Sequence, residues 1–317
     1  MALAFLCLPF LLQCSPRKQS EADRDDSKAT GDRFMEFVEV GNAGNPDDSD
    51  GLGGVAYSFE IGKYPVTNRQ YCEFLNAVAA ADPHGLFDLQ MGREPHGGIK
   101  RNGAAGGYTY EPKSGWENKP VTFVNWFDAA RFCNWMHHGK PSGPAGASTT
   151  EAGAYSLSAT SGIELPGSDS ENGANGRNDD ARYFLPSEDE WYKAAYYQPA
   201  EEGGDADGYW LFPIRGNDPP VAEPPPGGGR SANFDSVLES LTEVGAYKDG
   251  AGPYGAFDMA GNTWEWTEQI FKGGLRGVRG GSWLNGSAEL RATARATSGS
   301  GFGLGNNGFR LARRASN

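Results

Sequence analysis

Glycine and proline recur along the whole chain and limit how much regular structure it can form. The 317 residues include 46 Gly and 20 Pro, which is well above ordinary usage. Proline removes a backbone donor and glycine costs conformational entropy, so both shorten helices and strands. Hydrophobic residues still make up 38% of the chain, with 8 Trp, 13 Tyr and 17 Phe among them. We therefore expect a packed core that is held by short elements and many loops.

Acidic residues clearly outnumber basic ones. The chain has 41 Asp and Glu against 28 Lys and Arg, which gives a formal net charge of -13 at pH 7. Binding a nucleic acid through its phosphates needs a basic face, so we expect no nucleic-acid partner. Cations, neutral glycans and basic proteins fit this charge better.

The first 14 residues form an apolar run that ends at Cys14. The run is too short to span a bilayer and is typical of a signal segment. The sequence LLQC at 11–14 resembles a bacterial lipoprotein processing site, which would place a lipid on Cys14 and tether the protein to a membrane. Residues 15–33 are polar and mixed in charge, as in a disordered tether. We expect export to the cell surface or periplasm, or a cytoplasmic protein if the chain start is wrongly assigned.

Apolar residues at helical spacing predict three helices in the domain that follows, over residues 34–317. Each pattern begins at a residue that can cap a helix N-terminus, namely Thr67, Asn125 and Ser187. After the first two caps, apolar residues recur at i, i+3, i+4 and i+7. Ser187 is followed by Glu190, the spacing of a capping box.

Alternating residues predict strands over 34–40 and 55–61, and a hairpin around 107–110. Cys72 and Cys133 lie on the first two predicted helices. Buried free thiols are one interpretation of these cysteines. In an exported protein they could instead form a disulfide, whose geometry the sequence does not fix.

Six motifs occur in one order between residues 35 and 313. They read IGKYPVTNRQY, PVTFVNWFDAARFCNWM, FLPSEDEWYKAAYY, GAFDMAGNTWEWTE, VRGGSW and NGFRLA. In this order they closely resemble the formylglycine-generating enzyme and sulfatase-modifying-factor domain family. The resemblance implies a single α+β domain with a C-type-lectin-like fold and little regular secondary structure.

The motif DMAGNTWE predicts a metal site. Two carboxylates and two carbonyls, spaced i, i+3, i+5 and i+7 in a tight turn, can converge on one hard cation. In the family the matching positions bind calcium, through side chains at Asp258 and Glu265 and carbonyls at Gly261 and Thr263. The alternative is a turn in which the two carboxylates accept backbone hydrogen bonds. Asn233 matches the start of a second family calcium site, but the segment that completes that site is not evident.

A pair of cysteines is missing from the C-terminal half. In the oxygen-dependent members of the family, this pair follows the Gly-Gly-Ser-aromatic motif, binds copper and oxidises a substrate cysteine. The matching positions here are about Asn285 and Leu290, and neither can supply a thiolate to Cu(I). We expect calcium but no copper, and the sequence argues against this enzymatic reaction. The alternative is a formylglycine-generating-type oxidoreductase acting on a protein cysteine, or an unrecognised enzymatic branch, which rests on family membership alone.

Within the segment 284–307, residues 284–287 and 296–307 are mostly small, show no periodicity and look freely substitutable, as in a displayed surface. They also resemble the diversified segment of variable proteins of diversity-generating retroelements, some of which use this fold. An idle surface loop and a structural docking module are the alternatives. We predict a non-catalytic, lectin-like or protein-binding surface for a protein or glycan ligand. Its candidate ligand-binding residues are Leu284, Asn285, Ser287, Thr297, Ser298, Ser300, Phe302, Leu304, Asn306 and Asn307.

Overall fold

A computed structural model describes Met1, residues 34–157 and residues 176–315. From Met35 onward the chain forms one compact unit. The predicted signal segment 1–14, with Cys14, and the predicted tether 15–33 lie outside the described residues beyond Met1. No helix in the described part of the chain combines the length and the hydrophobicity that crossing a bilayer requires.

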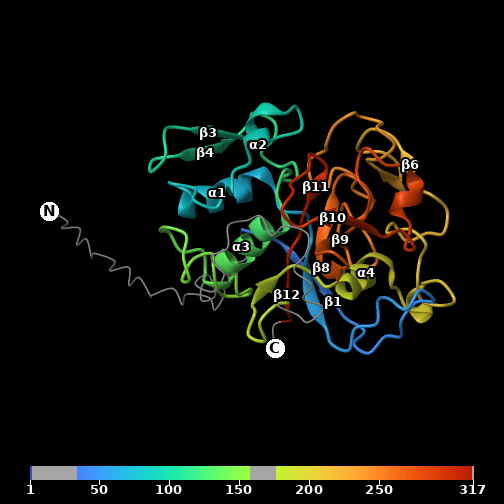
Figure 1. Ribbon diagram of the computed structural model, residues 1–317. Coiled ribbons are helices and arrows are strands. Elements are labelled where there is room, and N and C mark those ends of the chain that lie inside the picture. Colours follow the sequence, from blue (N-terminus) through green and yellow to red (C-terminus); the bar gives the residue numbers. More distant parts are fainter. Residues whose placement is uncertain (2–33, 158–175, 316–317) are drawn as a thin grey trace. The chain divides into compact units, whose positions relative to one another are not determined.

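The three predicted helices are present, and each begins where its capping residue predicts (Figure 1). Thr67, Asn125 and Ser187 each cap their helix in a capping box, with side-chain bonds in both directions. A short helix that the sequence did not predict, α2, is capped by Asp88 and is too short to show a period. The α-helices are α1 (Asn68–Val78), α2 (Leu89–Arg93), α3 (Trp126–His137) and α4 (Glu188–Tyr196), and two 3-10 helices are η2 (Ala200–Glu202) and η3 (Ser287–Leu290).

One four-stranded sheet joins the two ends of the domain. Its order is β1-β2-β12-β5 and all its pairs are antiparallel. The strands are β1 (Phe37–Val40), β2 (Phe59–Gly62), β5 (Tyr183–Phe184) and β12 (Ala312–Arg314). The strand predicted over 55–61 starts only at Phe59, because Val55 is held in a loop. Its N–H donates to Asn45 Oδ1 over 3.2 Å and its carbonyl accepts from Gly44 over 2.8 Å.

The second four-stranded sheet carries the candidate surface. Its order is β10-β9-β8-β11, with β11 parallel to β8 and the other pairs antiparallel. The strands are β8 (Trp264–Phe271), β9 (Leu275–Arg279), β10 (Ala296–Gly299) and β11 (Asn307–Gly308). Residues 284–307 therefore follow β9 and contain β10 and the first residue of β11, which are the two outer strands of this sheet.

Two smaller sheets complete the strands. β3 (Ile99–Asn102) and β4 (Thr109–Pro112) form an antiparallel hairpin where one was predicted. β6 (Val221–Ala222) and β7 (Ser231–Ala232) form a parallel pair.

Aromatic side chains pack α1 and α3 against the C-terminal motif. Phe309 contacts the rings of Tyr71 and Phe132, with centroids 6.4 and 5.4 Å apart. Cys72 and Cys133 are buried free thiols in this region, so they do not form the alternative disulfide. Burial raises the pKa of Cys72 to about 12 and that of Cys133 well above its usual value.

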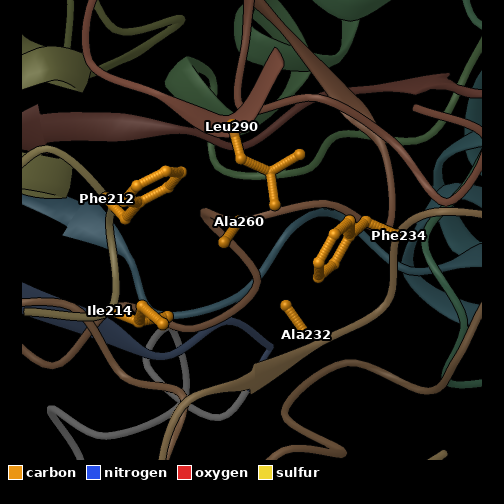
Figure 2. Packing of buried hydrophobic residues seen from close by; sticks show 6 residues of the cluster. All are labelled: Phe212, Ile214, Ala232, Phe234, Ala260 and Leu290. Atoms are coloured by element: carbon orange, nitrogen blue, oxygen red, sulfur yellow. The ribbon is translucent and has the colours of Figure 1, made fainter. Parts of the chain in front are cut away.

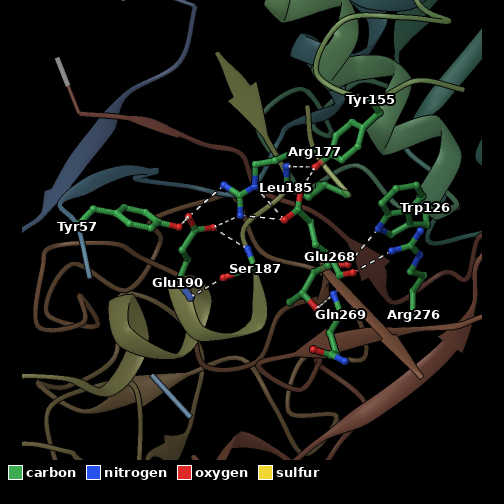
Figure 3. A network of polar contacts seen from close by, with 11 residues as sticks. Tyr57, Trp126, Tyr155, Arg177, Leu185, Ser187, Glu190, Glu268, Gln269 and Arg276 are labelled. Carbon is green, nitrogen blue, oxygen red and sulfur yellow. Dashed lines mark hydrogen bonds and ion pairs between the residues drawn. The ribbon is translucent and has the colours of Figure 1, made fainter. Parts of the chain in front are cut away.

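A buried ionic network joins α4 to β8 (Figure 3). The Arg177 guanidinium lies between two carboxylates, 2.7 Å from Glu190 Oε2 and 2.8 Å from Glu268 Oε2. Tyr57 and Tyr155 donate to Glu190 and Glu268 over 2.8 and 2.6 Å. Burial raises the pKa of Glu268, and Arg177 only partly opposes that shift. The network positions α4 beside the sheet that carries the candidate surface.

Candidate ligand-binding surface

The segment from Ser300 to Asn306 is fixed by its backbone. Phe123 N–H donates to the Leu304 carbonyl over 2.9 Å, and Trp126 N–H donates to the Ser300 carbonyl over 3.0 Å. A Cβ at Gly303 would lie 2.4 Å from the Phe123 carbonyl, so this approach requires glycine. The segment is thus held against the start of α3 by main-chain contacts, in which the side chains of Phe302 and Leu304 take no part.

Four of the predicted ligand-binding residues face solvent. Phe302, Leu284 and Leu304 are 67%, 51% and 47% exposed, and Thr297 is exposed on β10. Large apolar side chains this exposed within one short segment are typical of an interaction surface. The serines among the predicted residues, Ser287, Ser298 and Ser300, are half-buried.

The three predicted asparagines instead face the protein. Asn285 Oδ1 accepts from Ser282 N and Oγ over 3.0 and 2.6 Å. Asn306 Nδ2 donates to the same hydroxyl over 3.2 Å. Asn307 is 2% exposed, and its Nδ2 has no partner among the described residues. Asn285 and Asn306 therefore stabilise the turn after β9 in this structure, while the exposed side chains offer the contact area.

Two further apolar residues, one exposed and one half-buried, adjoin this surface, and no pattern in the sequence identifies them. Leu275 pairs with Gly299 across β9 and β10 and is 37% exposed. Phe271 pairs with Leu275 at the end of the β8–β9 hairpin. The only signal in the sequence is the hairpin FKGGL at 271–275, which does not show which strand lies beside it.

The two positions that match the copper-binding cysteines lie in different surroundings. Leu290 is fully buried in an apolar cluster with Phe212, Phe234 and Ala260 (Figure 2). Asn285 is bonded to Ser282, as described above. An apolar side chain and an amide occupy these positions, and neither is a ligand for a soft metal ion.

The predicted calcium ligands lie around a buried ion pair. Glu265 Oε2 accepts from Trp191 Nε1 and Arg310 Nε over 2.7 and 2.5 Å, and Oε1 accepts from Arg310 Nη2 over 2.6 Å. Asp258 Oδ2 accepts from Gly245 N over 2.7 Å. Burial raises the pKa of Asp258 to about 6, and Glu265 adds to this shift.

These contacts fit calcium only in part. Glu265 would have to share an oxygen between Arg310 and the ion, and the Gly261 carbonyl already accepts from Thr263 N over 2.9 Å. Within residues 34–157 and 176–315, no group of three or more His, Cys, Asp or Glu is arranged to hold a metal. Near the predicted second site, Asn233 Oδ1 is buried without a partner among the described residues. Calcium at either place stays a prediction.

The fold and this surface define a loop-rich α+β domain that displays its C-terminal segment beside a mixed sheet. Residues 52–315 match the family described as Sulfatase-modifying factor enzyme 1-like domain, and the chain belongs to this family. The predicted family and fold class are confirmed.

Several individual proteins are similar to this chain. "Crystal Structure of CarF" is 21% identical, with a TM-score of 0.53, over 89% of this chain and 99% of that chain. Treponema denticola variable protein 1 is 18% identical, with a TM-score of 0.47, over 88% of this chain and 95% of that one. Hercynine oxygenase of Mycolicibacterium smegmatis is 24% identical over 75% of this chain. The chain spans about half the length of that curated relative, 49%.

Proposed function

We propose that this chain is a non-catalytic, ligand-binding member of the sulfatase-modifying factor family. The observation that carries the proposal is the exposure of Phe302 and Leu304 on a segment whose backbone is bonded to the start of α3. Leu284, in the turn after β9, is exposed as well. Apolar side chains on a fixed backbone lose little conformational entropy on binding. The ligand is a protein or a glycan, since the charge of -13 disfavours nucleic acid.

The combination of exposed side chains with a backbone that is bonded to α3 also supports sequence diversification of this segment. Thr297, Phe302 and Leu304 face solvent, so exchanging them changes the surface and leaves the main-chain contacts in place. A reverse transcriptase gene beside an imperfect copy of codons 284–307 that differs at adenines would support this part of the proposal. A locus without either would remove it and leave ligand binding as such untouched.

Binding is tested by screening the purified protein against arrays of secreted proteins and glycans. Each ligand found is then measured with Leu284→Ala, Phe302→Ala and Leu304→Ala, and we expect at least one of them to weaken binding about tenfold, as truncation of an interface anchor does. Val221→Ala is the matched control, because Val221 is 53% exposed on β6. Ligands that bind all four variants equally would show that the surface is elsewhere.

An enzymatic function is the second candidate, because one curated relative is an oxygenase. Against the copper-dependent reaction stand the buried Leu290 and the Ser282-bound Asn285. Incubation with copper, reductant, oxygen and a cysteine-containing sulfatase-type peptide, followed by mass spectrometry, decides this point. Formylglycine in the product would make the protein an enzyme. An unchanged peptide beside an active control enzyme would remove that reaction.

We also propose a structural calcium ion at Asp258, and export with a lipid on Cys14. Asp258 supports the first because its carboxylate is partly satisfied and its pKa is raised to about 6. Calcium should then raise the melting temperature of the wild type and leave that of Asp258→Asn unchanged; equal shifts would exclude this site. Mass spectrometry of the membrane fraction tests whether Cys14 carries an acyl chain.

A further inference from the structure

β10 is an open edge of the sheet that carries the candidate surface. It is the outermost strand in the order β10-β9-β8-β11. Within the described residues, no backbone group of Ala296, Thr297 or Ser298 bonds to anything outside β9. The side chains along this edge are small, with the sequence ATSG, so they leave the backbone accessible. An edge of this kind is a template for pairing with another chain.

An apolar strip lies on the face of the sheet beside this edge. Register places Leu275 and Gly299 on the same face. A Cβ at Gly299 would lie 2.6 Å from Cδ2 of Phe302, so the Phe302 ring covers the glycine. In the same way, the Phe271 ring approaches the Cβ position of Gly277 to 3.3 Å. Phe271, Leu275 and Phe302 together form what we call the glycine-bedded strip.

The rest of that face is already occupied, which bounds the strip. Arg279 projects from the same face and is 2.6 Å from Glu188 of α4. Arg295 also bonds to Glu188 and lies over the Phe271 ring at 4.9 Å. α4 therefore covers one end of the face, while Phe302 and Leu275, 67% and 37% exposed, remain open at the other.

We propose that β10 binds an extended segment of a partner protein as an added strand, with one apolar side chain of that segment packed on Phe302 and Leu275. This inference rests on the proposed ligand-binding function and names its partner class. Only another extended backbone supplies donors and acceptors at strand spacing along the edge. A glycan could stack on Phe302 but would leave that ladder unpaired.

The charges around the strip and on the whole chain favour one kind of partner segment. The two arginines beside the strip share the carboxylate of Glu188, and Asp189 and Asp50 add further negative charge near Arg295. The chain as a whole carries -13. A segment with Lys or Arg on its outward face and an apolar residue on its inward face fits best.

The test uses a synthetic peptide of about seven residues that alternates Phe or Val with Lys or Thr, titrated into the full-length protein. Two further peptides carry N-methyl groups on alternate amides. In one of them the methyl groups lie along one edge of the extended peptide, and in the other they lie along the opposite edge. We expect the parent peptide to bind with Kd below about 1 mM. One methylated peptide should bind like the parent and the other should not bind, because an added strand uses a single edge. Amide exchange at Thr297 or Ser298 should slow on binding.

Two protein variants separate this inference from the broader proposal. Phe302→Ala should weaken the parent peptide about fivefold or more. Val221→Ala is the matched control, because Val221 is 53% exposed on β6, outside the strip, and it should leave the affinity within about twofold.

Equal binding of both methylated peptides, or no binding of the parent, would overturn strand addition. Array ligands that still depend on Leu284 or Leu304 would then leave the ligand-binding proposal standing. If instead the peptide binds as expected but no array ligand depends on those side chains, strand addition stands and the broader surface fails.

Discussion

At the scale of single residues, the Glu265–Arg310 pair holds the motifs of the chain together. Both side chains are fully buried. Arg310 also donates to the carbonyls of Gly62 and Phe257 over 2.9 and 2.8 Å. Glu265→Gln leaves the guanidinium buried without its counter-charge, so it should lower the free energy of unfolding by about 3 to 5 kcal/mol. Urea denaturation measures this loss.

The double variant Glu265→Leu/Arg310→Met is the control for that prediction. Removing both charges together also removes the unpaired ion, so the double variant should be more stable than Glu265→Gln. A loss below about 1 kcal/mol in Glu265→Gln would show that the pair is solvated.

The buried Lys193 should make the free energy of unfolding increase as the pH becomes alkaline. Its side chain is buried and donates to the Asn42 carbonyl over 2.9 Å. Burial lowers its pKa to about 8 from 10.5. Between these two values the unfolded chain binds the proton and the folded chain does not, so the free energy of unfolding increases with pH. We expect a rise of about 2 kcal/mol between pH 7.5 and 9.5, measured by urea denaturation.

Lys193→Met should lose most of this rise. Tyrosine titration sets the upper end of the pH range in which stability rises, because burial raises the pKa of Tyr196 and of several other tyrosines in the folded protein. Unfolded tyrosines lose their protons first, which lowers stability above about pH 10. If Lys193→Met keeps the full increase in unfolding free energy below that pH, a group other than Lys193 causes the increase.

At the scale of elements, the caps of α1, α3 and α4 set where the helices begin. Asn125 accepts from Asp128 N over 3.0 Å and Asp128 bonds back over 3.2 Å. Asn125→Ala should therefore cost about 1 kcal/mol in unfolding free energy. Thr293→Ala, at an exposed position outside any helix, is the matched control and should change stability little. Equal effects of the two changes would mean that the cap contributes nothing of its own.

Elements with a local signal were predictable from the sequence, and elements without one were not. The helical spacing of apolar residues in α1 and α3 and the capping box of α4 each lie within one short stretch of sequence. β5, β11 and β12 have two or three residues each and exist because distant segments pair with them. Ala312, for example, lies between Ile61 and Phe184. No window of sequence contains that pairing.

The same distinction applies to the candidate surface. Small residues and missing periodicity predict a binding surface within residues 284–307. Which side chains face solvent depends on contacts that the sequence does not show, such as Asn306 with Ser282. The strip on β8 and β9 depends on the register of Leu275 with Gly299, which is a property of the folded sheet.

At the scale of the whole molecule, the excess of acidic groups opposes folding through mutual repulsion. The net charge of -13 lies on one compact domain. The range of the repulsion between its charges depends on the salt concentration. The Debye length falls from about 30 Å at 0.01 M to about 8 Å at 0.15 M ionic strength. Buried pairs such as Glu265–Arg310 are screened much less than exposed charges. Sodium chloride over this range should therefore raise the melting temperature by about 2 to 4 °C.

Two adjacent exposed residues provide the decisive comparison for this repulsion. Lys248 and Asp249 lie side by side in the chain on the same loop. Asp249→Asn makes the net charge less negative by one and should raise the melting temperature at low salt. Lys248→Gln makes it more negative by one and should lower that temperature, and both differences should shrink at 0.15 M salt. If the variants shift together, the salt dependence comes from local contacts, and the fold is not limited by its overall charge.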